Sequence, residues 1–225
     1  MTTFVLIPGA GGAAWYWSRV VPLLRAAGHQ ALAVDLPGDD ERAGLPEYAC
    51  LVARAIDAAA PADDVVIVGQ SLGGFTAARV AAERPVRALV FVNAMIPAPG
   101  ESAGQWWVDV GQEQAARAAA EQGGYSPEFD EESWFLHDVD PLVVAEGEPH
   151  QRPEAGIAFE STWDVDGWPD APIHVVAGRD DRLFPLALQQ RVARDRVGVE
   201  PVVLPGGHLM ALSRPVELAN HLLSL

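Results

Sequence analysis

The stretch Val65-Val66-Ile67-Val68-Gly69-Gln70-Ser71-Leu72-Gly73-Gly74 decides how this chain folds. Its first four residues are all β-branched, and such a continuous apolar run is typical of a strand covered on both faces. A helical pattern begins directly after it, at Leu72. Ser71 lies between them in the pattern G-x-S-x-G, whose glycines allow a sharp strand-to-helix turn. The stretch predicts a serine nucleophile at the end of a strand; the alternative is a plain turn with Ser71 as a helix N-cap.

On both sides of this stretch, short apolar runs alternate with helical patterns. The expected strands are Thr3–Ile7, Ala31–Val34, Val65–Val68, Arg87–Val92, Ile173–Ala177 and Pro201–Leu204. The expected helices are Trp15–Ala27, Pro46–Ala59, Leu72–Glu83, Leu186–Asp195 and Pro215–Leu223. Alternation of this kind implies right-handed crossovers. The sequence therefore predicts an α/β fold with a doubly wound, mostly parallel six-stranded sheet.

Residues 97–171 break the alternation and differ in charge from the rest of the chain. They hold 17 Asp and Glu against two basic residues, Arg117 and Arg152, whereas the remainder holds 14 acids and 13 arginines. A structureless loop of this length is improbable inside a compact domain. We expect a helical cap over 97–171, inserted between a first core part, 1–96, and a second, 172–225. Its helices are expected around Gln112–Gln122, Glu131–His137 and Pro141–Glu146.

The composition excludes several classes of function. The net charge of −16 argues against partners that need a basic footprint, so we expect neither nucleic acid nor a membrane surface. All 15 basic residues are arginine, which removes Schiff-base and P-loop chemistry that depends on lysine. The run Gly9-x-Gly11-Gly12 lacks the third glycine of a dinucleotide site. We expect no cofactor and no metal, and a small-molecule substrate as partner.

Three further expectations concern the single cysteine, the cellular location and the oligomeric state. The single cysteine, Cys50, excludes an intrachain disulfide framework, and its helical setting favours a small core residue. The first residues show neither a basic region nor a cleavage site for secretion, which favours a cytoplasmic protein. The oligomeric state stays open, a homodimer included.

A serine hydroxyl needs a base, and histidine serves best near neutral pH. Of six histidines, His208 follows the last predicted strand, at the carboxyl edge where Ser71 also emerges. The others fall before a strand, within a strand, in the last helix or in the cap: His29, His174, His221, His137 and His150. His208 is the expected base. Either Asp180 or Asp181, after the fifth strand, could orient its imidazole.

The oxyanion of an acyl-transfer intermediate needs backbone N–H donors. One is expected from Leu72, which follows the nucleophile at a helix N-terminus. The other is expected from the loop after the first strand, from Ala10 with Gly11 as the alternative.

These motifs together resemble the α/β-hydrolase superfamily along essentially the whole chain. The order Ser71, Asp181, His208 is that of the family, whose acid usually lies in G-x-x-D-x-x-x-P, here Gly178, Asp181 and Pro185. This match favours Asp181 over Asp180. The runs Tyr16-Trp17, 35–38 (Asp-Leu-Pro-Gly) and 205–208 (Pro-Gly-Gly-His) resemble the small branch of plant methylesterases and hydroxynitrile lyases.

The resemblance implies the family's sheet without its first two strands, in the spatial order 2-1-3-4-5-6. Two departures matter. The oxyanion loop carries Pro8-Gly9 where the family often has His-Gly, so its anchoring differs. Hydroxynitrile lyases of this architecture hold cyanide with a cap lysine, which is absent here; that activity is not expected.

Aromatic residues concentrate in the predicted cap, where they either hold the cap on the core or line an apolar pocket. The candidate substrate contacts are Gly11, Met95, Trp106, Trp134 and Met210; for the methionines and tryptophans the alternative is core packing. The acidic cap favours neutral or cationic esters over anionic ones, although it could equally be a solvated surface.

The sequence thus predicts a serine hydrolase that cleaves a carboxylic ester of a small, largely apolar molecule through an acyl-enzyme. Two alternatives stay open. The same triad could serve carbon–carbon cleavage, cofactor-free oxygenation or cyclisation, because a fold does not fix a reaction. The chain could also be a small-molecule receptor without turnover.

Overall fold

A computed structural model describes residues 1–59, 64–165 and 167–225. Within it lies a six-stranded sheet in which all neighbouring strands run parallel, in the order β2-β1-β3-β4-β5-β6. The strands are β1 (Thr3–Ile7), β2 (Gln30–Ala33), β3 (Val65–Gln70), β4 (Ala88–Val92), β5 (Ile173–Gly178) and β6 (Val202–Leu204). Both the predicted strands and their predicted spatial order are confirmed, with bounds shifted by at most two residues.

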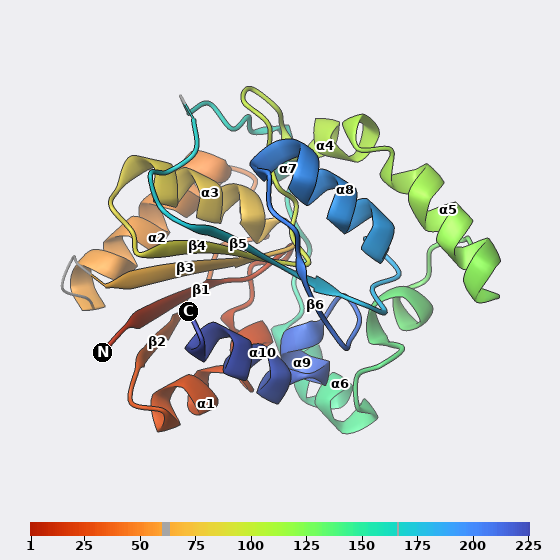
Figure 1. Ribbon diagram of the computed structural model, residues 1–225, viewed down its shortest axis with the longest axis horizontal. Helices are drawn as coiled ribbons and strands as arrows, with labels where there is room; N and C mark the ends of the chain where they lie inside the picture. Colours follow the sequence, from red (N-terminus) through yellow and green to blue (C-terminus); the bar gives the residue numbers. More distant parts are fainter. Residues whose placement is uncertain (60–63, 166) are drawn as a thin grey trace.

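The central strands are buried on both faces, as their continuous apolar runs predict. Every residue of β1, β3 and β4 is buried. On one face the core lies under α2 (Leu45–Ala59), α3 (Gly73–Glu83) and α8 (Leu186–Val197). On the other it lies under η1 (Ala14–Trp17), α1 (Val21–Ala26), α9 (Met210–Ser213) and α10 (Pro215–Leu223). Figure 1 shows the two helical layers above and below the sheet.

The predicted helix over Trp15–Ala27 is in fact two elements, the 3-10 helix η1 and the helix α1. Pro22 in the first turn of α1 explains the division, because proline lacks an N–H and suits a helix start. The expectation that Cys50 is a core residue is wrong. It lies on the exposed side of α2, whose buried side carries Tyr48, Ala49 and Val52.

The chain between β4 and β5 is largely helical. Its elements are α4 (Ala103–Asp109), α5 (Gln112–Gly123), the π-helix η2 (Glu132–Leu136), α6 (Pro141–Gly147), the 3-10 helix η3 (Glu148–His150) and α7 (Gly156–Glu160). Ser102 starts α4 in a capping box with Gln105. In Figure 1 the strands run from left to right, and α4, α5 and α6 lie on the right, toward the carboxyl ends of the strands.

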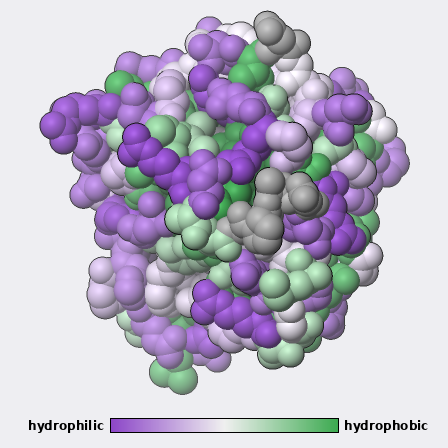
Figure 2. Space-filling model, turned by 90° about the vertical axis from the view of Figure 1, so that its left-hand side faces the viewer, coloured by the Kyte–Doolittle hydropathy of each residue, from purple (hydrophilic) through white to green (hydrophobic). Residues whose placement is uncertain are grey.

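The surface at the opposite, left-hand end of Figure 1 is shown in Figure 2, where hydrophilic residues prevail and hydrophobic ones are interspersed. Among the described helices, none has the length and apolar character that crossing a membrane would require.

Candidate active site

Ser71 occupies a tight turn between β3 and α3. Its φ of 50° lies in the left-handed region, which costs a non-glycine residue of order 1 kcal/mol or more. The neighbouring glycines allow the close approach that this turn demands. A Cβ on Gly69 would lie 2.6 Å from the Gly73 carbonyl oxygen, and one on Gly73 would lie 2.2 Å from that of Pro8. The G-x-S-x-G pattern is therefore required by backbone contacts.

His208 is paired with Asp181 inside the protein. The imidazole Nδ1 lies 2.8 Å from Asp181 Oδ2, and both side chains are almost fully buried. The other carboxylate oxygen accepts the backbone N–H groups of Leu183 and Phe184, each at 2.9 Å. Gln189 Nε2 adds a bond of 3.3 Å to Oδ2. With Asp181 Oδ2 as the acceptor facing Nδ1, the proton of the neutral imidazole lies on Nδ1 and Nε2 is left as the acceptor.

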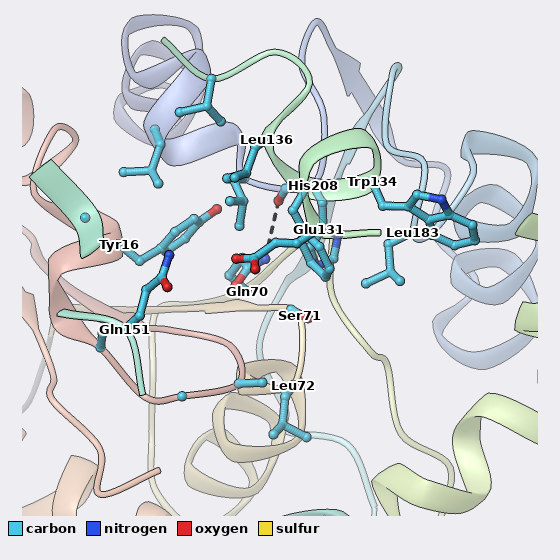
Figure 3. A pocket seen from close by; sticks show the side chains of 18 of the residues that line it. Tyr16, Gln70, Ser71, Leu72, Glu131, Trp134, Leu136, Gln151, Leu183 and His208 are labelled. Atoms are coloured by element: carbon cyan, nitrogen blue, oxygen red, sulfur yellow. Dashed lines mark hydrogen bonds between the residues drawn. The ribbon is translucent and has the colours of Figure 1, made fainter. Parts of the chain in front are cut away.

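The Nε2 atom of His208 has no hydrogen-bond partner among the described residues. Phe135 and Phe184 stand edge-on to the imidazole, with ring centroids 5.1 and 5.0 Å from its own. Ser71 and His208 border the same cavity, as Figure 3 shows. No hydrogen bond joins them in the described chain, which is common before substrate binds.

The loop that carries His208 is held from several sides. Gln70, next to Ser71, donates to the His208 carbonyl oxygen at 3.3 Å, the dashed line in Figure 3. Asn93 Nδ2 donates to the carbonyl oxygens of Gly207, at 2.8 Å, and His208, at 3.2 Å. Its Oδ1 accepts the Gly178 N–H at 2.6 Å. One buried side chain after β4 thus joins the end of β5 to the histidine loop.

Two backbone amides near Ser71 are unused. Within the described residues, neither the Ala10 nor the Leu72 N–H donates a hydrogen bond. The loop of Ala10 lies against the serine turn, because a Cβ on Gly9 would be 2.8 Å from Ser71 Cβ. The Gly11 N–H, by contrast, donates to Glu154 Oε2 at 2.6 Å. Gly11 borders the cavity, but its amide is engaged elsewhere.

The cavity in front of Ser71 has a volume of about 1060 Å³. Its apolar walls come mainly from the segment between β4 and β5; they include Trp107, Phe129, Trp134, Phe135, Leu136, Val139, Val143 and Phe159. Of the predicted substrate contacts, Gly11, Met95 and Trp134 line it. Two other expectations are corrected. Trp106 is 1% exposed, packs on Phe184 and donates to the Ile96 carbonyl oxygen, and Met210 is fully buried in the core under α9.

Burial shifts the pKa of Tyr16, which lines the cavity, and that of Glu154, which is hydrogen-bonded to the lining residue Gly11. It raises the pKa of the Tyr16 phenol, which accepts the Ala211 N–H at 3.3 Å. It also raises the pKa of Glu154 above that of an ordinary glutamate. The charged groups of the lining balance in sign, Glu113 and Glu131 against Arg117 and Arg152. Across the part of the chain that the structure describes, no group of three or more His, Cys, Asp or Glu side chains could hold a metal ion.

Sequence reasoning missed three contacts of this site. Asn93 directly follows a predicted strand, so its place at the carboxyl edge was a readable signal. Phe135 and Asp138, which accepts the Gly207 N–H at 2.8 Å, lie far from the triad in sequence, and no local pattern marks them.

This fold agrees with comparisons to known proteins. The model of the alpha/beta hydrolase family matches residues 4–221, so the chain belongs to that family. A probable esterase, PIR7A, of Oryza sativa subsp. indica is 43% identical over 110 residues, which are 45% of this chain and 42% of that protein. A polyneuridine aldehyde esterase of Rauvolfia serpentina is 32% identical over 108 residues, 44% of this chain and 41% of the relative.

The matched stretch thus spans about two-fifths of the length of these curated relatives. Solved structures match over more of the chain. A crystal structure of polyneuridine aldehyde esterase covers 100% of this chain and 98% of its own, with a TM-score of 0.81 and 20% identity. A pyrethroid hydrolase from Sphingobium faniae gives 0.77 and 22%, covering 99% and 96%. At these identities the likeness establishes the fold alone.

Proposed function

We propose that this chain hydrolyses carboxylic esters of small, largely apolar molecules, with Ser71 as nucleophile. The observation that carries the proposal is the buried pair of His208 and Asp181, which leaves an unpartnered Nε2 on the same cavity as the strained Ser71. Such a pair serves to take the proton of a hydroxyl and to stabilise the imidazolium that results. Relatives named as esterases support this reaction.

The reaction proceeds in two halves. Ser71 Oγ attacks the ester carbonyl while His208 Nε2 takes its proton and Asp181 stabilises the imidazolium. The Ala10 and Leu72 amides hold the oxyanion. His208 then protonates the departing alcohol, which leaves an acyl group on Ser71. A water molecule then attacks the acyl carbon while His208 takes its proton; the bond to Ser71 Oγ breaks, the carboxylic acid leaves and His208 returns the proton to Ser71 Oγ.

The cavity supports an apolar ester as substrate. Its walls are aromatic and aliphatic, and its volume of about 1060 Å³ is at the upper end of typical small-molecule sites. The charges of the lining balance, so any preference for neutral or cationic esters arises from the acids on the outside of the cap.

Some relatives carry names of other activities, among them a norfluorocurarine synthase and an alpha-hydroxynitrile lyase. The absence of lysine from this chain disfavours the lyase reaction. A carbon–carbon cleavage, cofactor-free oxygenation or cyclisation on the same triad is the alternative. A panel of p-nitrophenyl and methyl esters separates it from ester hydrolysis.

The direct test is covalent labelling. An organophosphonate should add stoichiometrically to Ser71, as located by mass spectrometry of the digest. Ser71→Ala should abolish both the label and the turnover of a p-nitrophenyl ester, while product or substrate analogues still bind. Folded protein that takes up no label would count against the proposal. Unchanged function in Ser71→Ala would favour a receptor.

A further inference from the structure

The loop that carries the Ala10 amide is fastened by residues between η3 and α7. Glu154 Oε2 accepts the Gly11 N–H at 2.6 Å. This bond fixes the plane of the peptide that follows Ala10 and withdraws the competing Gly11 donor from the cavity. Gly11 has a φ of +82°, and a Cβ there would lie 2.6 Å from the Arg152 carbonyl oxygen. The loop of Gly11 therefore contacts the segment of Arg152 and Glu154 through the backbone as well as through the Glu154 carboxylate.

Arg152 fastens the same loop at a second point. Its Nε donates to the Gly11 carbonyl oxygen at 3.1 Å, and its terminal nitrogens donate to both oxygens of Asp35. Asp35 in turn accepts the Ala14 N–H at 3.0 Å. Figure 3 shows Gln151, the residue before Arg152, on the pocket wall beside Tyr16. This segment thus forms the cavity wall and the support of the loop at once.

The second oxygen of Glu154 reaches the core. Oε1 accepts the Tyr48 hydroxyl at 2.6 Å, and Tyr48 is buried in α2. The carboxylate therefore spans the oxyanion loop and a core helix, with a hydrogen bond at each end. Burial disfavours the charged form of a carboxyl group at this place and raises the pKa of Glu154. The hydrogen bonds from Tyr48 and Gly11 offset part of that penalty.

We propose that Glu154 is a positioning residue for the oxyanion hole. By binding the Gly11 amide and the Tyr48 hydroxyl, Glu154 holds the Ala10 N–H toward the oxyanion. The proposal rests on the proposed ester hydrolysis. A donor of this kind acts in the transition state more than in the ground state, so its misplacement lowers kcat and leaves KM nearly unchanged.

The test compares Glu154→Ala, Glu154→Gln and, as a matched control in the same segment, the exposed Glu148→Ala. Glu154→Ala should lower kcat for a p-nitrophenyl ester by about 10- to 100-fold, with KM within about threefold. Its affinity for a trifluoromethyl ketone, whose adduct places an oxyanion in the hole, should fall in parallel. Glu154→Gln keeps an oxygen for the Gly11 N–H and should recover most of kcat, and Glu148→Ala should match the parent.

An unchanged kcat in Glu154→Ala overturns the proposal. So does an equal loss of kcat in the Ala and Gln variants when both have the same melting temperature as the parent. If Glu154→Ala does not fold, Glu154→Asp, which withdraws the carboxylate by one carbon, is measured instead with the same expectation. Hydrogen exchange of residues 9–13 gives a readout without turnover, and it should quicken in Glu154→Ala. The parent could fail to react with an organophosphonate and still show slower hydrogen exchange at residues 9–13 than Glu154→Ala. That result would refute the proposed hydrolysis but not the role of Glu154 in positioning the loop.

Discussion

At the scale of single residues, the proposed ester hydrolysis depends on which ring nitrogen of His208 carries the proton. Asp181 is the only carboxylate within hydrogen-bond distance of that imidazole among the described residues. In Asp181→Asn, the side-chain oxygen can keep the Leu183 and Phe184 amides, which leaves an NH₂ group toward Nδ1. That group favours the wrong tautomer, with Nε2 protonated. We expect kcat to fall by about 10⁴-fold, measured with a p-nitrophenyl ester.

The matched control is Asp180→Asn. Asp180 is exposed, and its Oδ2 accepts the Gly206 N–H at 3.2 Å. An amide oxygen can accept the same bond, so kcat should fall by less than about tenfold. The reverse ranking of the two variants would show that the sequence motif led to the wrong acid.

At the scale of elements, the junction of β3 and α3 sets the position of Ser71, the proposed nucleophile. Gly69→Ala would place a methyl group 2.6 Å from both Ala77 Cβ and the Gly73 carbonyl oxygen, so strand and helix would have to separate. We expect the free energy of unfolding to drop by about 1–3 kcal/mol, measured by denaturant unfolding. The control is Gly156→Ala at the start of α7, where the nearest atom to a Cβ is 3.9 Å away. Similar losses in both variants would contradict the argument from contact.

The same junction shows how far local sequence determines structure. Strand and helix positions in the core follow from apolar runs and glycine spacing, so β1, β3 and β4 could be predicted nearly to the residue. A helix around Glu131–His137 could also be predicted, although not that it is the π-helix η2 (Glu132–Leu136). The short helices α4, α7 and α9 could not be predicted, because elements of one or two turns are stabilised by tertiary contacts more than by their own pattern. Trp134 lines the cavity, whereas Trp106 is buried in the core. Both are tryptophans in short helices between β4 and β5, so their local sequence does not distinguish the two positions.

The hydrogen bonds that hold the loops of the site could not be predicted from the sequence. Asn93, Asp138 and Glu154 act through hydrogen bonds to backbone groups distant in the chain. A single carboxylate or amide has no spacing that marks such a partner. What could be predicted was the edge of the sheet at which they meet, because the carboxyl ends of parallel strands share it.

At the scale of the whole molecule, the segment between β4 and β5 is bonded to the loop of His208 and to the loop of Ala10. Asp138 accepts the Gly207 N–H beside His208, and Glu154 accepts the Gly11 N–H beside Ala10. The segment that supplies most of the apolar wall of the cavity thus also fastens these two loops. The pair Arg196 and Glu101, largely buried, ties the start of this segment to α8.

The dependence of stability on pH is a property of the whole chain. Burial lowers the pKa of His137, His174 and His221, and the charge of His174 lowers that of His221 further. An unfolded histidine titrates near 6.5. As the pH falls below 6.5 the unfolded chain binds more protons than the folded one, so these groups reduce stability from pH 6.5 down to their lower folded pKa values, below which the loss is complete. The raised pKa of Glu154 acts in the opposite direction above about 4.5.

Three histidines outweigh one glutamate, so the free energy of unfolding should be greatest above pH 6.5 and decline between pH 6.5 and 5. Denaturant unfolding at pH 7.5, 6.5 and 5.5 measures this slope. Combining His174→Gln with His221→Gln removes two of these three partly buried imidazoles, and the decline should flatten by more than half. Both sites lie away from the cavity, so kcat at pH 7.5 should stay within about twofold of the parent. Equal stability at pH 7.5 and 5.5 in the parent, or an unaltered slope in the double variant, would show that these imidazoles accept protons as readily folded as unfolded.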